Sequence, residues 1–153
     1  GGALVPMELG KALAAAEFNL RAAIESTGAV ITSDALPTVL ANERQMVQLL
    51  QNLVGNAIKS HGEKPPRIHV SAERHEGEWQ IAVADNGIGI DPTFFNRLFV
   101  VFARLHNRSE YAGNGIGLAI CKKIIERHGG HIWLKSQPGH GATFFFTLHG
   151  VKS

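Results

Sequence analysis

The sequence has few of the features that would place it in a special class of protein. Only one of its 153 residues is cysteine, Cys121, which excludes an internal disulfide and suits a reducing compartment. No apolar run approaches the ~20 residues that span a bilayer, and no signal peptide is recognisable. The net charge of +2 gives no argument for nucleic acid or an anionic membrane as a partner. We therefore expect a cytoplasmic protein that binds neither.

What the sequence does contain is the composition of one globular domain. Hydrophobic residues make up 44% of the chain and charged residues 18%, which is typical of a folded protein that buries a core. Glycine stands out, because many of the 17 glycines lie between Gly87 and Gly141. Glycine clustered in this way is typical of backbone that must approach something closely.

Hydrophobic periodicity predicts an α/β fold. Helical and alternating patterns follow one another in the order helix, strand, helix, two strands, helix, two strands. This order predicts a two-layer sandwich, in which three helices cover one face of a mixed, mostly antiparallel sheet. The predicted helices are residues 8–26, about 42–60 and 113–128, and the predicted strands are residues 29–32, 68–72, 79–83, 132–134 and 143–148.

The second predicted helix carries a polar motif. Asn52, Asn56 and Lys59 are four and three residues apart, so they share one face of the helix. Two amide oxygens suit a hydrated Mg²⁺ that phosphates already partly neutralise, and the lysine suits the phosphates themselves. A solvated polar helix face remains an alternative interpretation.

A second motif, Asp85-Asn-Gly87-Ile-Gly89-Ile90, follows directly after a predicted strand. The carboxylate of Asp85 could accept a hydrogen bond from an exocyclic amine such as that of adenine. The neighbouring glycines would let a flat ring lie close to the main chain. The alternative is an ordinary Asp-Asn-Gly turn.

A third motif, Gly113-Asn-Gly115-Ile-Gly117-Leu118, leads into the last predicted helix. Backbone N–H groups in a glycine-rich turn at a helix N-terminus bind phosphate. The turn lacks the spacing of a dinucleotide-binding fingerprint, and the chain contains no P-loop pattern. A flexible hinge is the alternative.

The order of these motifs resembles that of the catalytic domain of sensor histidine kinases, which belong to the GHKL or Bergerat ATPase superfamily. Between the second and third motifs, Phe95-Asn-Arg-Leu-Phe99-Val-Val-Phe102 matches the family's F box. Gly139-His-Gly-Ala-Thr143-Phe resembles its last glycine box. The resemblance extends from about Val5 onward. The segments Phe-Ala-Arg-Leu-His106 and Gly-Leu-Ala-Ile-Cys-Lys-Lys123 look most like the phytochrome-like kinases.

The resemblance implies ATP and Mg²⁺ as cofactors and assigns a role to each motif. Asn56 and Asn52 would hold Mg²⁺, Lys59 and Arg104 would contact phosphates, and Asp85 would bind the adenine amine. Residues 8–150 would be the catalytic domain, with an ATP lid at about 91–113 and a tail at 151–153. Residues 1–7 would be a cloning remnant or a link to dimerisation helices. The other nucleotide-binding positions would be Gly87, Gly89, Ile90, Gly113, Gly115, Gly117, Leu118 and Thr143.

The same resemblance implies transfer of the γ-phosphoryl group of ATP to a histidine on separate dimerisation helices, for relay to a response regulator. None of the eight histidines lies in the helix context that carries the family's acceptor, so we expect a monomeric domain that needs those helices. Relatives that hydrolyse ATP carry a glutamate base where this chain has Asn52, and a neutral amide cannot take a proton from water. This difference favours a kinase.

Two departures from the family keep other functions open. Ser60 stands where an aromatic or similarly broad residue usually flanks the nucleotide, and Asn114 stands where threonine is common. Both fit a nucleotide-binding module with weak or no kinase activity. An anti-sigma-factor type serine kinase has the same fold, although the phytochrome-like sequence of the lid argues against that function.

Overall fold

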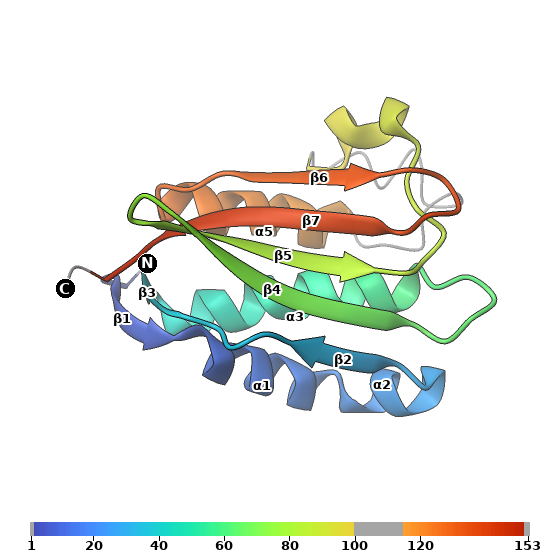
Figure 1. Cartoon of the computed structure of the whole chain (residues 1–153), viewed down its shortest axis with the longest axis horizontal. Helices are drawn as coiled ribbons and strands as arrows, with labels where there is room; N and C mark the ends of the chain where they lie inside the picture. The colour runs from blue at the N-terminus through green and yellow to red at the C-terminus, as the bar shows by residue number, and fades with distance from the viewer. Residues whose placement is uncertain (1, 100–114, 152–153) are drawn as a thin grey trace.

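A five-stranded sheet and the helices on one of its faces form the two layers of the molecule (Figure 1). The computed structural model describes residues 2–99 and 115–151. One strand pairing, between β2 and β4, is parallel, and the other three pairings are antiparallel. The predicted fold class is therefore confirmed. The strand order is β2 (Val30–Ser33), β4 (Arg67–His75), β5 (Glu78–Asp85), β7 (Ala142–His149) and β6 (Ile132–Ser136).

The helix α3 (Glu43–Lys59) lies in the middle of the helical layer, between α1 (Leu9–Asn19) and α5 (Gly115–Arg127) (Figure 1). It also packs against β4 and β5. Its sequence explains this position, because one face of the helix is apolar along its whole length. None of the helices within the described ranges is long and apolar enough to cross a bilayer. The buried side chains of α3 are Met46, Leu49, Leu50, Leu53, Val54, Ala57 and Ile58.

The sheet contributes alternate side chains to the core. Phe146 is fully buried and lies opposite Ile81 of β5 and Ile132 of β6. Neighbours in one strand point to opposite faces, so the odd-numbered residues of β7 lie on the face without helices. The other inward-facing residues of the central strands are Ile68, Val70, Val83, Phe144 and Leu148.

The N-terminal region differs from the predicted element order. An additional two-stranded antiparallel sheet joins β1 (Val5–Glu8) to β3 (Thr38–Ala41). Each strand has only four residues. Pro6 lies within β1 and Pro37 directly precedes β3, so neither strand shows a clear alternation of apolar and polar residues. The sequence suggested that the catalytic domain begins at residue 8. Because β1 begins at Val5, the folded region starts before that residue.

The first predicted helix, residues 8–26, is two helices. The helix α1 ends at Leu20, whose φ and ψ of −100° and 7° leave the helical region, and α2 (Arg21–Thr27) follows. The apolar spacing continues across this break, which is why the periodicity predicts one helix. A short 3₁₀-helical segment, η1 (Pro92–Arg97), follows the loop after β5.

The N-cap of α3 offers a test of the fold. The side-chain Oδ1 of Asn42 accepts a hydrogen bond from the backbone N–H of Gln45 at 3.0 Å. We expect Asn42→Ala to lower the free energy of unfolding by about 1 kcal/mol, measured by urea denaturation, because one N–H of the first turn loses its acceptor. Asn42→Ser keeps an acceptor and should lose much less. Equal denaturation midpoints for Asn42→Ala and the unchanged protein would contradict this assignment.

Candidate functional site

The polar face of α3 carries the three residues of the first motif. Asn52 and Asn56 are half-buried, and Lys59 is exposed at the end of the helix. The Nδ2 of Asn52 donates to the backbone carbonyl of Gly117 at 3.4 Å, which ties α3 to the first turn of α5. The Asn52 side chain also forms a hydrogen bond with the Cys121 thiol, which belongs to the same helix, α5.

Asn56 holds a buried oxygen that needs a partner. Its Oδ1 is inaccessible to solvent and, within the described part of the chain, has no hydrogen-bond donor. Leaving such an atom unsatisfied costs about 1–3 kcal/mol, so groups of this kind usually mark a ligand or water site. The described residues contain no cluster of three His, Cys, Asp or Glu side chains that could hold a metal. A cation here would depend on amide oxygens and its accompanying anion, which fits hydrated Mg²⁺ bound to phosphates.

Asp85, the last residue of β5, presents an oriented carboxylate. Its Oδ1 accepts hydrogen bonds from the backbone N–H groups of Gly87 at 2.8 Å and Ala142 at 3.2 Å. Burial raises the pKa of this carboxyl group, and the two hydrogen bonds oppose the shift without cancelling it. Both hydrogen bonds go to Oδ1, so the other oxygen has no partner within the described part of the chain.

The loop after Asp85 is anchored on two sides by its backbone. The N–H of Ile88 donates to the carbonyl of Ser60 at the end of α3, at 2.9 Å, and the N–H of Gly139 donates to the carbonyl of Ile88 at 2.6 Å. A Cβ on Gly87 would collide with the Ser60 carbonyl. Gly89, with φ of +78°, packs against the carbonyl of Gln137 in the β6–β7 turn. The second motif therefore lies between the first motif and the last glycine box.

The third motif is only partly described. Gly115 begins α5, and Gly117 and Leu118 are buried within its first turns. Burial also raises the pKa of the Cys121 thiol on this helix to about 12, so the thiol stays protonated at neutral pH. The remaining predicted positions of this region, Gly113, Arg104, Phe102 and Asn114, lie outside the described residues.

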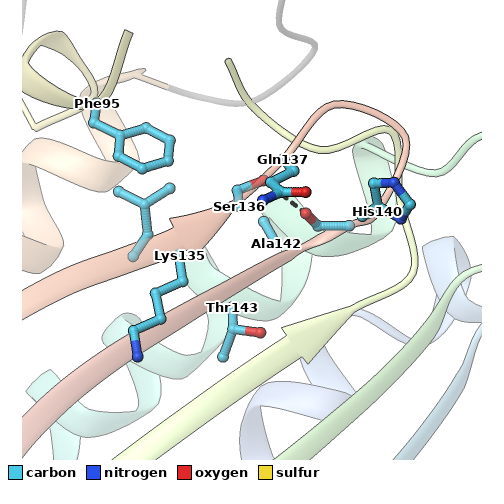
Figure 2. A pocket seen from close by; sticks show the side chains of 9 residues that line it. Phe95, Lys135, Ser136, Gln137, His140, Ala142 and Thr143 are labelled. Atoms are coloured by element: carbon cyan, nitrogen blue, oxygen red, sulfur yellow. Dashed lines mark hydrogen bonds between the residues drawn. The ribbon is translucent and has the colours of Figure 1, made fainter. Parts of the chain in front are cut away.

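The structure separates Thr143 from Asp85. In β7, Thr143 lies opposite Ala84 and Lys135, on the face of the sheet without helices. Figure 2 shows Thr143 and Lys135 side by side, directed away from Phe95. It is the backbone of the preceding residue, Ala142, that reaches Asp85. Thr143 and Phe145 are half-buried whereas Ala142, Phe144 and Phe146 are buried, which agrees with Thr143 on the outer face.

The described part of the Phe-rich segment packs on the core. Phe95 and Phe99 contact the buried cluster, and the Phe99 ring meets the Phe144 ring edge-on at 6.2 Å between centroids. These two rings therefore anchor the described part of the segment to the core. Phe95 also borders an open hollow of about 490 Å³ beside the end of β6 (Figure 2). Sequence reasoning missed Ser136, which lines this hollow and whose hydroxyl contacts the backbone of Ile90 at 2.8 Å.

The pKa shift of Asp85 predicts the pH dependence of stability. A folded-state pKa above the ordinary 3.8 means that the folded protein binds a proton more readily than the unfolded chain. Stability contributed by this group therefore falls as pH rises from about 3.8 to the raised pKa, and stays constant above it. Asparagine keeps the acceptor oxygen without the charge. We expect Asp85→Asn to gain stability relative to the unchanged protein as pH rises from about 3 to 7, measured by urea denaturation.

Asp91 is the matched control, because the pKa of its carboxyl group is lowered whereas that of Asp85 is raised. Hydrogen bonds from the backbone N–H and then the hydroxyl of Thr93 lower the pKa of this exposed carboxyl group. Its stabilising contribution is present above the ordinary pKa and is lost as pH falls through the folded pKa. Asp91→Asn should therefore lose stability relative to the unchanged protein as pH rises. Parallel pH profiles for the two variants would show that the assigned causes are wrong.

Comparisons with known proteins agree with this geometry. Residues 41–151 match the family of histidine kinase-, DNA gyrase B- and HSP90-like ATPases. Cyanobacterial phytochrome A of Nostoc sp. (strain PCC 7120) is 60% identical over 141 residues, which cover 92% of this chain and 18% of that protein. Phytochrome-like protein Cph1 of Synechocystis sp. (strain PCC 6803) is 55% identical over 130 residues, which cover 85% of this chain and 17% of that protein.

A solved structure gives the same result for the fold. Full-length ShkA in complex with AMPPNP matches with a TM-score of 0.81 and 27% identity, over 98% of this chain and 32% of that chain. The chain spans less than a fifth of the length of the two phytochrome relatives. From the ordered motifs, the fold and these matches together, the chain belongs to the histidine kinase-, gyrase- and HSP90-like ATPase family, as a histidine kinase-type catalytic domain similar to that of the phytochromes.

Proposed function

We propose that this domain binds ATP with Mg²⁺ and transfers the γ-phosphoryl group to a histidine on a dimerisation domain, for relay to a response regulator. The observation that carries the proposal is the buried Oδ1 of Asn56, which has no partner among the described residues. Asn56 lies one helical turn before Ser60, whose carbonyl accepts from the loop that follows Asp85. A metal ion bound to phosphates would give this oxygen a partner. The exocyclic amine of a nucleotide base would give the Asp85 carboxylate a hydrogen-bond donor. The structure of ShkA holds AMPPNP, an adenosine nucleotide, which supports the same ligand class here.

Each motif has a role in this proposal. Asp85 accepts a hydrogen bond from the exocyclic amine of adenine, and the backbone at Gly87 and Gly89 lies against the ring. Asn56 and Asn52 present amide oxygens to Mg²⁺, which when bound neutralises phosphate charge. Lys59 contacts a phosphate from the exposed end of α3. The remaining proposed contacts are Ile90, Gly115, Gly117 and Leu118, with Gly113 and Arg104 outside the described residues.

The neutral side chain at position 52 supports transfer rather than hydrolysis. Its amide donates to the Gly117 carbonyl and cannot act as a base. A neutral imidazole presents its own lone pair to the phosphoryl group and needs no strong base. Catalysis then consists of positioning the two reactants and neutralising charge in the transition state.

Ser60 supports a second proposal, a nucleotide-binding domain that transfers slowly or not at all. The Ser60 hydroxyl donates to the carbonyl of Ala57 in its own helix at 3.2 Å. This position therefore offers a nucleotide a small side chain turned toward the helix, where the family usually has a broad one.

A transfer assay with Asn56→Ala tests the first proposal. The domain is mixed with ATP, Mg²⁺ and a separate fragment that carries the histidine-bearing helices, and acid-labile phosphate is measured on the fragment. We expect transfer by the unchanged domain and a loss of ATP affinity of roughly tenfold or more for Asn56→Ala, because a buried ligand oxygen is removed. Gln48→Ala, at an exposed position of the same helix, should change neither the transfer nor the ATP affinity.

Other outcomes of this assay identify the alternatives. ATP binding without transfer would support the nucleotide-binding domain. An acid-stable phosphoserine would indicate a serine kinase of the anti-sigma-factor type. Absence of ATP binding would refute both proposals.

A variant of Ser60 tests the missing ring contact. A ring–base contact contributes about 1 kcal/mol, so we expect Ser60→Phe to bind ATP roughly fivefold more tightly in a calorimetric titration. Ser60→Leu adds apolar bulk without a ring and should gain less. If Ser60→Phe and the unchanged domain bind ATP equally well, Ser60 does not border the base.

A further inference from the structure

Ser136, the last residue of β6, bridges two backbone segments of the site. Its hydroxyl oxygen accepts a hydrogen bond from the N–H of Ile90 at 2.8 Å and donates to the carbonyl of Gly141 at 2.6 Å. Both distances are short, and the residue is half-buried. The hydroxyl therefore uses its donor and one acceptor position, which fixes its direction.

The Gly141 carbonyl belongs to the same peptide group as the N–H of Ala142. That N–H donates to Oδ1 of Asp85 at 3.2 Å. Four groups thus follow one another toward the carboxylate: the Ile90 N–H, the Ser136 hydroxyl, the Gly141–Ala142 peptide and Asp85. Each hydrogen bond in such a chain polarises the next, so the hydroxyl strengthens the donor that holds Asp85.

We propose that Ser136 is a positioning residue of the nucleotide site, which acts through the Gly141–Ala142 peptide on Asp85. The proposal rests on the adenine-binding role of Asp85 proposed above. Other links between this loop and its neighbours are backbone hydrogen bonds, such as Ile88 to Ser60, and the Asn86 side chain, which accepts from the N–H of Arg67 and donates to the carbonyl of Pro65. The Ser136 hydroxyl is a link that a single substitution removes.

The orientation of Asp85 has a consequence for specificity. A carboxylate accepts hydrogen bonds, so it favours adenine, whose exocyclic amine is a donor, over guanine, whose oxygen at the same position is an acceptor. A carboxylate that turns freely can avoid the guanine oxygen. Loss of the Ser136 hydroxyl should therefore weaken adenine binding and reduce discrimination between the two bases, without affecting the phosphate contacts.

Calorimetric titration of the whole chain tests this inference with ATP, GTP and tripolyphosphate, each with Mg²⁺. We expect Ser136→Ala to bind ATP about fivefold more weakly and to bind tripolyphosphate unchanged, because the loss concerns the base alone. Ser136→Thr keeps the hydroxyl and should restore ATP affinity. Gln137→Ala, the exposed neighbour that lines the same hollow, is the control and should behave as the unchanged protein (Figure 2).

A second measurement does not depend on nucleotide. The pKa of the Asp85 carboxyl group can be followed by carbon NMR, and Ser136→Ala should raise it further, since the Ala142 N–H becomes a weaker donor. An unchanged pKa of Asp85, or an equal loss of affinity for ATP and tripolyphosphate, would overturn the inference. If the unchanged protein binds no ATP, the proposed function fails, and the NMR titration alone decides whether Ser136 positions Asp85.

Discussion

The burial of one face of α3 is the constraint on which the site depends. Seven side chains of this helix are buried against the sheet and the neighbouring helices, and each of the larger ones contributes about 1.5–3 kcal/mol. Any rotation of α3 about its axis would expose several of them. Because a helix has 3.6 residues per turn, the same packing fixes the direction of Asn52, Asn56 and Lys59. Apolar contacts thus hold a polar face in place, and with it a buried oxygen of Asn56 that has no partner among the residues that the structure describes.

Sheet register then fixes the other half of the site. Asp85 lies opposite Ile68, two residues beyond Val83, so it falls on the face that the helices cover. The glycine box of the β6–β7 turn reaches it because β7 pairs directly with β5. The close approach of Gly141 to the Asp85 backbone leaves no room for a side chain at position 141. The carboxylate is therefore oriented by two segments that are far apart in sequence, and its burial is offset by backbone donors.

Sequence patterns predicted the parts of this arrangement that local periodicity controls. The helix α3 and the β4–β5 hairpin are long and strongly patterned, and their polar and apolar faces follow from spacing alone. The four-residue strands β1 and β3 have no such pattern; they pair with each other, and Val39 of β3 also bridges to Gly150. Ser136 was missed for a related reason. Its contact with Ile90 depends on the strand order β5–β7–β6, which no local motif contains.

The contacts of Asn52 are relevant to how one fold can support either phosphoryl transfer or ATP hydrolysis. The Gly117 carbonyl at the start of α5 faces the side chain at position 52 and accepts a hydrogen bond from a donor there. An amide supplies one, whereas an ionised glutamate would place two acceptors together and would have to turn away from α5. A carboxylate base at this position would therefore lose this link between α3 and α5. Asn52 and Gly117 therefore act as one unit, which joins the polar face of α3 to the glycine-rich turn at the start of α5.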